Sequence, residues 1–452
     1  MSGKKNTQPE SKQLLGFWDV LGIGIGQMVG AGVMVLIGIC IEITGAGTPL
    51  AFLAAVAMVL CPALVFAAMG SAVPQTGGMY TYVRRFLGRK ASLVYLSYNV
   101  ASQLLLALFA TGFAEYATGL FPGINTKWLA FSILTVCYLA NLFGLQIATK
   151  FQNIMVVILL AALLLFVGFG LPKVDWSVFT QPNAIMPNGG KAFLTAASLL
   201  TFATAGAETV AELGGEMKNP GKYIPFAIVF STLIIGLLCA AVSFVATGVL
   251  PLDVVAGKSL VQVAEAVFPK WLYVFFLIGG GMFASASTLN ATFSWCTKGL
   301  LVATEDGWLP KSMGKVSKRS GVPYVYLTLF YIMGAIPILS GTSPRVISML
   351  GNAAATLYQL FPIVAAYMLY KLASDEAKNA SFKFPPTVFN ILITLAIFMQ
   401  LTIIFFNIED VLNGRNILVI YTLIVTAYAF IREKRVKEIA QEKSEMQTDH
   451  IT

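Results

Sequence analysis

Charged residues are scarce in this sequence. Asp, Glu, Lys and Arg make up 11% of its 452 residues, whereas they make up about a quarter of an average soluble domain. Histidine occurs once, as His450, which excludes a histidine proton relay among the apolar segments. Cysteine is also rare, and the cysteines lack the short paired spacings of a zinc or disulfide framework; they are Cys40, Cys61, Cys137, Cys239 and Cys296. We therefore expect neither a metal site nor a cofactor.

Apolar residues fill most of the chain instead. They make up 57% of it, which is close to the content of about twelve helices of about 20 residues each. The sequence therefore predicts an all-α polytopic membrane protein with about twelve transmembrane helices. The expected spans are Phe17–Ile41, Pro49–Val73, Leu93–Leu120, Trp128–Phe143, Phe151–Leu171, Ala192–Leu213, Ile224–Leu250, Trp271–Ala303, Val322–Ser340, Val346–Tyr370, Pro386–Phe406 and Asn416–Ile431.

The positive charges indicate how these helices lie in the membrane. The net charge is +9, but Lys and Arg fall in short groups between apolar segments and form no basic–aromatic surface of the kind that binds nucleic acid. Most of them lie in alternate loops and in the two tails, and such segments stay on the cytoplasmic side. We therefore expect a multi-pass protein of the plasma (inner) membrane, with cytoplasmic tails at 1–16 and 432–452 and no nucleic-acid partner.

Two of the expected helices are interrupted. The first contains the glycine-rich stretch GIGIGQMVGAG at 22–32, and the sixth contains TFATAGAE at 201–208. These stretches occupy corresponding places in two five-helix halves, 17–171 and 192–370, followed by two further helices in 386–431. Paired interruptions of this kind point to the binding site of an inverted-repeat transporter. Where a helix unwinds in the membrane, freed N–H groups can bind a carboxylate and freed carbonyls an ammonium group.

The glycines of the first interruption have a second interpretation. Gly22, Gly26 and Gly30 are spaced by four residues, which is the pattern by which small residues let two helices pack closely. The two interpretations are compatible, because one stretch can both unwind and pack.

Glu208 is the candidate residue with the strongest physical argument. It follows the sixth-helix interruption at about mid-membrane, where an ionisable side chain is costly and is by default a functional candidate. The alternative is a structural acid that accepts hydrogen bonds from the unwound backbone. Glu212 and Glu216 follow at spacing four on one helical face toward Lys218, and we expect them to be ion-pairing gate residues or interfacial charges.

Motifs in a fixed order along the chain resemble one known family. They are GQMVGAGVM at 26–34, PQTGGMYTY at 74–82, FATAGAE at 202–208 with EMKNP at 216–220, and EDGWLP at 305–310. Together they resemble the amino acid–polyamine–organocation (APC) superfamily of permeases, which have the leucine-transporter fold. The resemblance covers essentially the whole apolar chain. It implies a 5+5 inverted repeat with discontinuous helices 1 and 6, plus two peripheral helices.

The resemblance also implies where a substrate binds. Backbone N–H groups around Ala31 and Gly32 would hold the carboxylate of an amino acid, and Phe202 would be an aromatic lid over it. Carbonyls that would accept from the ammonium group are those of Met28, Phe202, Ala203 and Ala205. Polar side chains expected at the cavity are Gln27, Ser102, Gln103, Thr204, Glu208, Asn290 and Thr292.

Two departures from relatives bear on coupling and substrate. The fifth span has no lysine at 153–160, where many proton-coupled relatives have one. A sodium site built from hydroxyls would use Ser285, Ser287 and Thr288, so proton and sodium both stay open as the coupling ion. Arginine/agmatine antiporters have a tryptophan at the position of Thr292, which counts against a guanidinium substrate here.

These features predict a secondary active transporter that moves amino acids by alternating access, as a symporter or an exchanger, with the amino acid and the lipid bilayer as its partners. A neutral amino acid is the default substrate, because Glu208 is the one obvious acid near the expected site; a basic amino acid or polyamine antiporter is the alternative. Two other classes are an amino acid sensor without flux and a polytopic membrane enzyme with Glu208 and Glu212 as acid and base. The enzyme is disfavoured, since the sequence lacks a metal-ligand cluster and a nucleophile motif.

Overall fold

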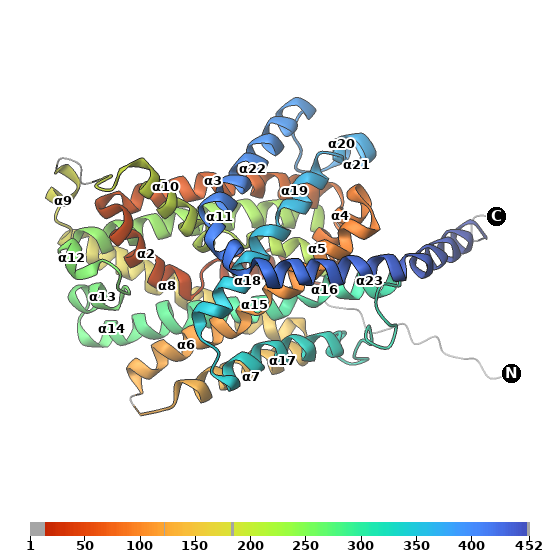
Figure 1. Cartoon of the computed structure of the whole chain (residues 1–452). Helices are drawn as coiled ribbons and strands as arrows, with labels where there is room; N and C mark the ends of the chain where they lie inside the picture. The colour runs from red at the N-terminus through yellow and green to blue at the C-terminus, as the bar shows by residue number, and fades with distance from the viewer. Residues whose placement is uncertain (1–13, 122, 182–184, 450–452) are drawn as a thin grey trace.

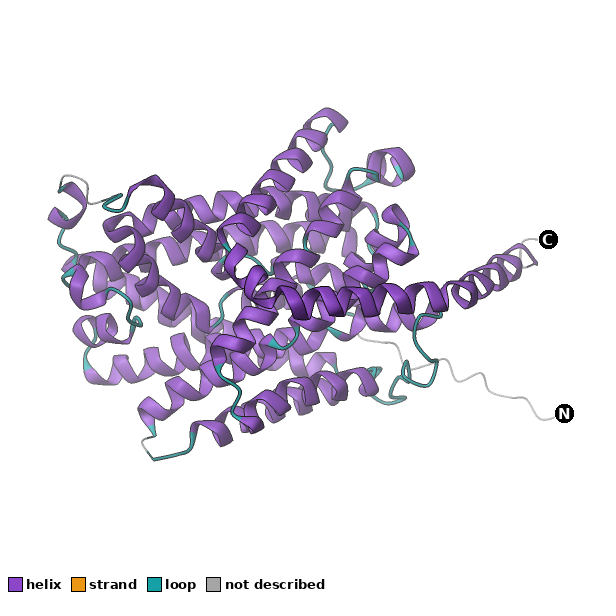
Figure 2. Ribbon diagram, in the orientation of Figure 1, coloured by secondary structure: helices purple, strands orange, loops and turns teal. Residues whose placement is uncertain are grey.

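The computed structural model describes residues 14–121, 123–181 and 185–449, and this part of the chain consists of helices and their connecting loops, without a β-strand (Figures 1 and 2). Within it, 9 helices are long and apolar enough to cross a membrane, and two shorter apolar helices, Thr126–Leu142 and Tyr324–Ser340, accompany them. The prediction of an all-α polytopic membrane protein is confirmed. His450 and most of the predicted tail 1–16 lie outside the described residues.

The helices fall into two runs along the chain. The first run is α1 (Phe17–Met28), α2 (Ala31–Thr44), η1 (Gly45–Gly47), α3 (Thr48–Ala72), α4 (Gly78–Leu87), α5 (Arg89–Ser102), α6 (Leu105–Leu120), α7 (Thr126–Leu142), α8 (Leu145–Gly170), η2 (Leu171–Lys173) and α9 (Ser177–Thr180). The second run is α10 (Gly189–Leu200), η3 (Thr201–Ala203), η4 (Ala207–Glu212), η5 (Gly214–Glu216), α11 (Pro220–Gly248), α12 (Leu252–Val255), α13 (Val261–Val267), α14 (Lys270–Phe276), η6 (Leu277–Met282), α15 (Phe283–Trp295), α16 (Thr297–Glu305), α17 (Tyr324–Ser340), α18 (Pro344–Tyr358), α19 (Leu360–Ala366), α20 (Leu369–Leu372), α21 (Ser374–Asn379), α22 (Pro386–Phe406) and α23 (Ile408–Asp449).

The first expected helix is broken into α1 and α2. Between them Val29 has a ψ of 88° and Gly30 has extended dihedral angles, φ −103° and ψ −174°. Helical geometry therefore stops at Met28 and resumes at Ala31. The interruption predicted within 22–32 is confirmed, and it lies in the C-terminal part of that stretch.

The earlier glycines of the same stretch serve close packing. Gly22 and Gly26 lie inside α1, where α8 approaches them. A Cβ atom at Gly22 would be 2.1 Å from Asn153 Oδ1, and one at Gly26 would be 1.7 Å from Gln152 Nε2. The packing interpretation therefore applies to these two glycines, while Gly30 belongs to the break.

The sixth expected helix is broken as well. Here α10 ends at Leu200, one 3-10 turn follows as η3, and Gly206 has a φ of +119°, a conformation that favours glycine. Beyond Gly206, η4 and η5 are 3-10 segments and not the single α-helical face that the sequence predicts for Glu208 to Glu216. Gly214 lies close to a neighbouring loop in this segment, since a Cβ there would be 2.7 Å from the carbonyl oxygen of Gln75.

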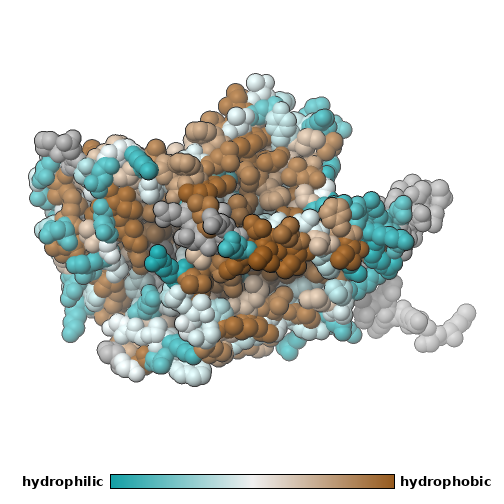
Figure 3. Space-filling view, in the orientation of Figure 1, coloured by the Kyte–Doolittle hydropathy of each residue, from teal (hydrophilic) through white to brown (hydrophobic). Residues whose placement is uncertain are grey.

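The helices around these breaks form a packed bundle. In it α1 contacts α8, α11 and α15, while α3 and α11 pack against each other and α22 packs on α3 (Figure 1). Apolar side chains cover most of the face in view, and hydrophilic ones gather toward its two ends (Figure 3), as expected for a protein that spans a bilayer.

The last helix is longer than the expected span 416–431. It continues through the charged residues to Asp449, so that much of the predicted tail 432–452 is helical. Arg432 donates to the carbonyl oxygen of Gly307 at 3.0 Å, and Lys90 Nζ lies 2.8 Å from Glu433 Oε2. These contacts connect α23 to the start of α5 and to the loop after α16.

The eighth expected span, 271–303, contains a π-helical segment, η6, between α14 and α15. Its glycines face neighbouring helices closely, and a Cβ at Gly281 would lie 2.5 Å from Cδ1 of the Tyr116 ring on α6. An aromatic ring in a packed interior cannot move aside at low cost. The π-helical segment therefore requires glycine at position 281.

We expect Gly281→Ala to lower the free energy of unfolding by about 1–3 kcal/mol, because the added methyl group overpacks the contact with Tyr116. Gly168→Ala in α8 is the matched control, since a Cβ there meets nothing within 4 Å. Apparent melting temperatures of the purified variants measure both. Equal melting temperatures for the two variants would contradict the packing argument.

Candidate functional site

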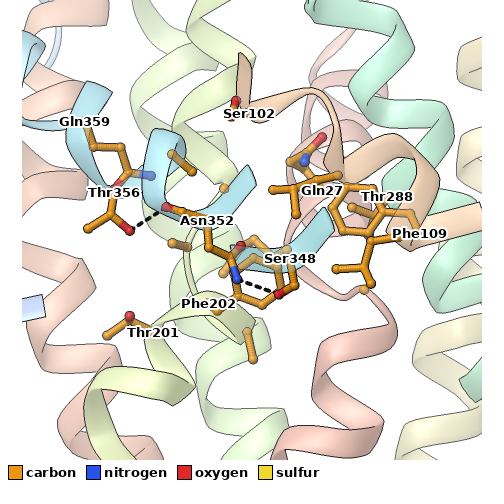
Figure 4. Close-up of a pocket in the computed structure, with 18 of the residues that line it drawn as sticks. Gln27, Ser102, Phe109, Thr201, Phe202, Thr288, Ser348, Asn352, Thr356 and Gln359 are labelled. Atoms are coloured by element: carbon orange, nitrogen blue, oxygen red, sulfur yellow. Dashed lines mark hydrogen bonds between the residues drawn. The ribbon is translucent and has the colours of Figure 1, made fainter. Parts of the chain in front are cut away.

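A cavity of about 500 Å³ lies where the two broken helices meet (Figure 4). Its volume falls within the range of small-molecule sites, about 300–1,000 Å³. Residues from α1, η3, α6, α15 and α18 contribute to its wall. The predicted site residues that line it are Gln27, Met28, Phe202, Ala203, Ala205, Glu208 and Thr292, together with Ser102 and Gln103.

Opposite helix ends meet at this cavity. The N-terminus of α2, at Ala31 and Gly32, follows directly on Gly30, which lines the cavity; the side-chain surroundings of Ala31 and Gly32 lie outside the described residues. The C-terminus of α10 leads into η3 and Phe202, and both α10 and η3 contact α2. A helix N-terminus presents free N–H groups and partial positive charge, and a C-terminus presents carbonyls and partial negative charge. The arrangement suits a zwitterion.

Side chains of α15 hold the first break in place. Thr288 Oγ1 lies 2.8 Å from the carbonyl oxygen of Gly26 and 3.1 Å from that of Val29. Gln27 Oε1 accepts hydrogen bonds from Trp295 Nε1 at 2.8 Å and from Thr292 Oγ1 at 3.2 Å. The carbonyl oxygens of Gly26 and Val29 and the side-chain oxygen of Gln27 therefore have donors within hydrogen-bond distance.

The hydroxyls considered for a sodium site also bond to carbonyls. Ser285 donates to Gly281 and Ser287 to Ala284, at 3.3 and 3.0 Å. In the part of the chain that the structure describes, no group of three or more His, Cys, Asp or Glu side chains could hold a metal ion.

Glu208 spans the second break. Its Oε2 accepts from the backbone N–H of Gly206 at 2.9 Å, and its Oε1 accepts from Nε2 of Gln359, directly after α18, at 3.2 Å. Glu208 is 9% exposed as a residue and lines the cavity. It therefore supports the unwound backbone, as the structural interpretation requires, and it also faces the site.

Glu212 and Glu216 are not among the described residues that line the cavity. Glu216 Oε1 lies 2.7 Å from Lys298 Nζ of α16, and both side chains are buried, so Glu216 is ion-paired, while its role as a gate residue stays a prediction. Met217 is extended, so the helical face ends before Lys218. Glu212 Oε1 accepts from Tyr95 Oη at 3.4 Å.

These acidic residues belong to a closed end of the bundle. Leu15 N–H donates to the carbonyl oxygen of Glu216 at 2.8 Å, and Gly77 N–H donates to that of Glu212 at 2.9 Å. The ion pair with Lys298 adds a third link. The cavity lies on the other side of these contacts, toward α2, α10 and the start of α18.

Two of the polar residues expected at the cavity lie elsewhere. Thr204 is buried and bonds to the carbonyl oxygens of Leu200 and Thr201. Asn290 belongs to a buried polar cluster, defined here as Asn141, Gln152, Asn290 and Ser294, which joins α7, α8 and α15.

In this polar cluster Asn290 Nδ2 donates to Gln152 Oε1 at 2.8 Å, and Asn141 Nδ2 donates to Asn290 Oδ1 at 2.9 Å. Ser294 Oγ donates to Asn141 Oδ1 at 2.9 Å, and Gln152 Nε2 reaches the carbonyl oxygen of Gly22 in α1 at 3.4 Å. The cluster therefore connects α1 to the surrounding helices.

Sequence reasoning missed the α18 side of the cavity. Four polar residues line it there: Ser348, Asn352, Thr356 and Gln359 (Figure 4). Their spacing of four, four and three residues in an otherwise apolar span places them on one helical face, and this pattern was a signal that could have identified them. Phe109 and Glu115 of α6 line the cavity as well.

We expect Lys298→Met to destabilise the protein by about 3–5 kcal/mol, because it removes one partner of a buried ion pair. Lys437→Met is the matched control: its pair with Glu433 is exposed, and its loss should cost less than about 1 kcal/mol. Thermal unfolding measures both, and Glu216→Gln added to Lys298→Met should restore part of the loss. Equal costs for the two single variants would refute the role of the pair.

Comparison with known proteins agrees with this architecture. A family model described as amino acid permease matches residues 15–429. The chain is 28% identical over 363 residues to the branched-chain amino acid permease BcaP of Bacillus subtilis (strain 168), covering 74% of this chain and 75% of the relative. It is 28% identical over 412 residues to the methylthioribose transporter of the same organism (84% and 86% covered) and 29% identical over 290 residues to the inner membrane transport protein YbaT of Escherichia coli (strain K12; 61% and 66% covered). The chain belongs to the amino acid permease family, within the APC superfamily, whose members are membrane transporters and not enzymes.

Proposed function

We propose that this protein is a secondary transporter that carries amino acids, neutral ones by default, across the plasma membrane by alternating access. The observation that carries the proposal is the cavity at which the N-terminus of α2 and the C-terminal end of α10 meet. Such paired breaks at one depth form the binding sites of inverted-repeat transporters.

In this proposal the substrate lies between the two breaks. Its carboxylate binds N–H groups at Ala31 and Gly32, and its ammonium group binds carbonyls of Met28, Phe202, Ala203 and Ala205. Phe202 lines the cavity and is 36% exposed, as a lid that has yet to close would be. The contacts around Glu212 and Glu216 would then open while the opposite side closes.

The proposed topology has twelve membrane helices. The halves 17–171 and 192–370 form the inverted repeat, helices within 386–431 are peripheral, and both tails face the cytoplasm. The opposed breaks in the first and sixth helices and the excess of positive residues at one set of loops support this arrangement.

The charges at the cavity argue against a substrate with an acidic side chain. Of the described residues that line it, Glu115 and Glu208 are acidic, and none is Lys, Arg or His. A substrate with an acidic side chain would therefore lack a positive partner. Glu208 already accepts two hydrogen bonds, which makes a basic amino acid or polyamine the less favoured alternative.

Transport in liposomes tests the proposal. The purified protein is reconstituted into vesicles loaded with unlabelled amino acids, and uptake of labelled amino acids is measured with empty vesicles as the control. Polyamines and methylthioribose are included, because one relative carries methylthioribose in its name. Amino acid exchange is the expected result. Uptake of polyamines or methylthioribose without any uptake of amino acids would overturn the proposal. Binding of amino acids without any flux would overturn it as well.

If a proton gradient drives uptake, we expect Glu208→Gln to abolish that uptake while exchange at equal pH persists, because an amide cannot bind and release a proton in this range. Glu265→Gln on α13 is the matched control, since Glu265 is exposed and does not line the cavity. Initial uptake rates with and without the gradient measure the effect. Unchanged gradient-driven uptake in Glu208→Gln would show that another group couples transport.

A further inference from the structure

The polar face of α18 differs from the rest of the cavity wall in how its hydrogen bonds are used. Thr356 Oγ1 donates to the backbone carbonyl of Asn352 at 2.8 Å, and Asn352 Nδ2 donates to Ser348 Oγ at 3.0 Å (Figure 4). Gln359 Nε2 donates to Glu208 at 3.2 Å. Each of these three groups therefore already donates one hydrogen bond to an acceptor within the protein.

An acceptor on the same face is left over. Asn352 Oδ1 is buried and has no hydrogen-bond partner among the described residues, although its side chain lines the cavity. A buried polar atom without a partner is costly. Reversing the amide would leave the other end of the same group in the same position. A ligand that supplies a hydrogen-bonding group at this place removes the cost.

The surrounding wall limits the charge of that group. Leu105, Leu108 and Phe109 line the cavity from α6, so the environment of the amide is largely apolar. Among the described residues that line the cavity, the carboxylates are Glu208 of η4, which already accepts from Gln359, and Glu115 of α6, and neither belongs to α18. A neutral hydrogen-bonding group therefore fits the uncharged amide of Asn352.

Building on the proposed function, we propose that Asn352 is the residue that selects the substrate side chain. It favours neutral amino acids whose side chain carries a hydroxyl or a carboxamide, which donates a hydrogen bond to the Asn352 amide. The ends of α2 and α10 bind the ammonium and carboxylate groups that all amino acids share, and α18 discriminates between their side chains.

Isosteric pairs of amino acids isolate this contact. Threonine and valine have nearly the same shape, and so do asparagine and leucine, but only the first of each pair can form the hydrogen bond. A site built around a hydrogen bond rejects an analogue that lacks it, because a buried group is then left unpaired. We expect the protein to bind threonine at least about tenfold more tightly than valine, a factor that corresponds to about 1.4 kcal/mol.

The experiment measures binding of both pairs to the purified full chain by ligand-induced thermal stabilisation. In Asn352→Leu the threonine-to-valine ratio is expected to fall to about one, with valine binding retained. Asn390→Leu is the matched control: Asn390 is exposed on α22 and does not line the cavity, so the ratio should stay as in the wild type. If Asn352→Leu does not fold, Asn352→Ala supplies the same comparison with less bulk.

Two failures are distinguishable. If amino acids bind and are exchanged but threonine and valine bind equally well to the wild type, or the ratio survives in Asn352→Leu or Asn352→Ala, the role of Asn352 is refuted and the transporter proposal stands. If no amino acid stabilises the wild type or is exchanged in liposomes, the transporter proposal is refuted, and the role of Asn352 with it.

Discussion

The structure depends on one constraint: within a membrane, every backbone N–H and carbonyl group needs a partner. A helix can be broken there only where protein or a cavity takes over its hydrogen bonds. Both breaks obey this rule. Thr288 reaches the carbonyls at the end of α1, and Glu208 accepts from the N–H of Gly206. The cavity lies between the backbone groups of the two breaks. The hydrogen bonds that stabilise these groups therefore also hold the cavity wall in place.

The glycine-rich first helix shows how one short stretch meets two demands. Gly22 and Gly26 keep α1 helical and bring it against Gln152 and Asn153 of α8, while Gly30 lies at the break. The close approach lets Gln152 of α8 reach the backbone carbonyl of Gly22 in the middle of α1. In this stretch the first glycines allow close helix packing, and the later glycine lies where the helix unwinds.

The sequence was a good guide to what local chemistry determines. Both interruptions and Glu208 could be predicted, because glycine content and an isolated acid in an apolar segment are visible without tertiary structure. Most of the predicted site residues line the cavity, but they are a minority of the residues in its wall. The pairing of Glu216 with Lys298 could not, since it joins residues 82 positions apart and depends on the extended Met217. Asn290 bonds to Gln152, 138 positions away, which is equally invisible locally. The polar face of α18 was visible as a spacing, but which side of the helix meets the cavity depends on packing.

The polar cluster of Asn141, Gln152, Asn290 and Ser294 has a consequence for how the protein responds to its surroundings. Carboxamides and hydroxyls do not ionise between about pH 4 and 9, so the hydrogen bonds of this cluster carry no charge that acidity could add or remove. Acidification of the medium would therefore leave the hydrogen bonds of the cluster unchanged. A separate contact between α1 and α8 does involve a carboxylate, since Asp19 Oδ1 accepts from Asn153 Nδ2 at 3.0 Å. Any sensitivity of the protein to acid must then arise at its carboxylates, while these neutral hydrogen bonds keep holding the helices together.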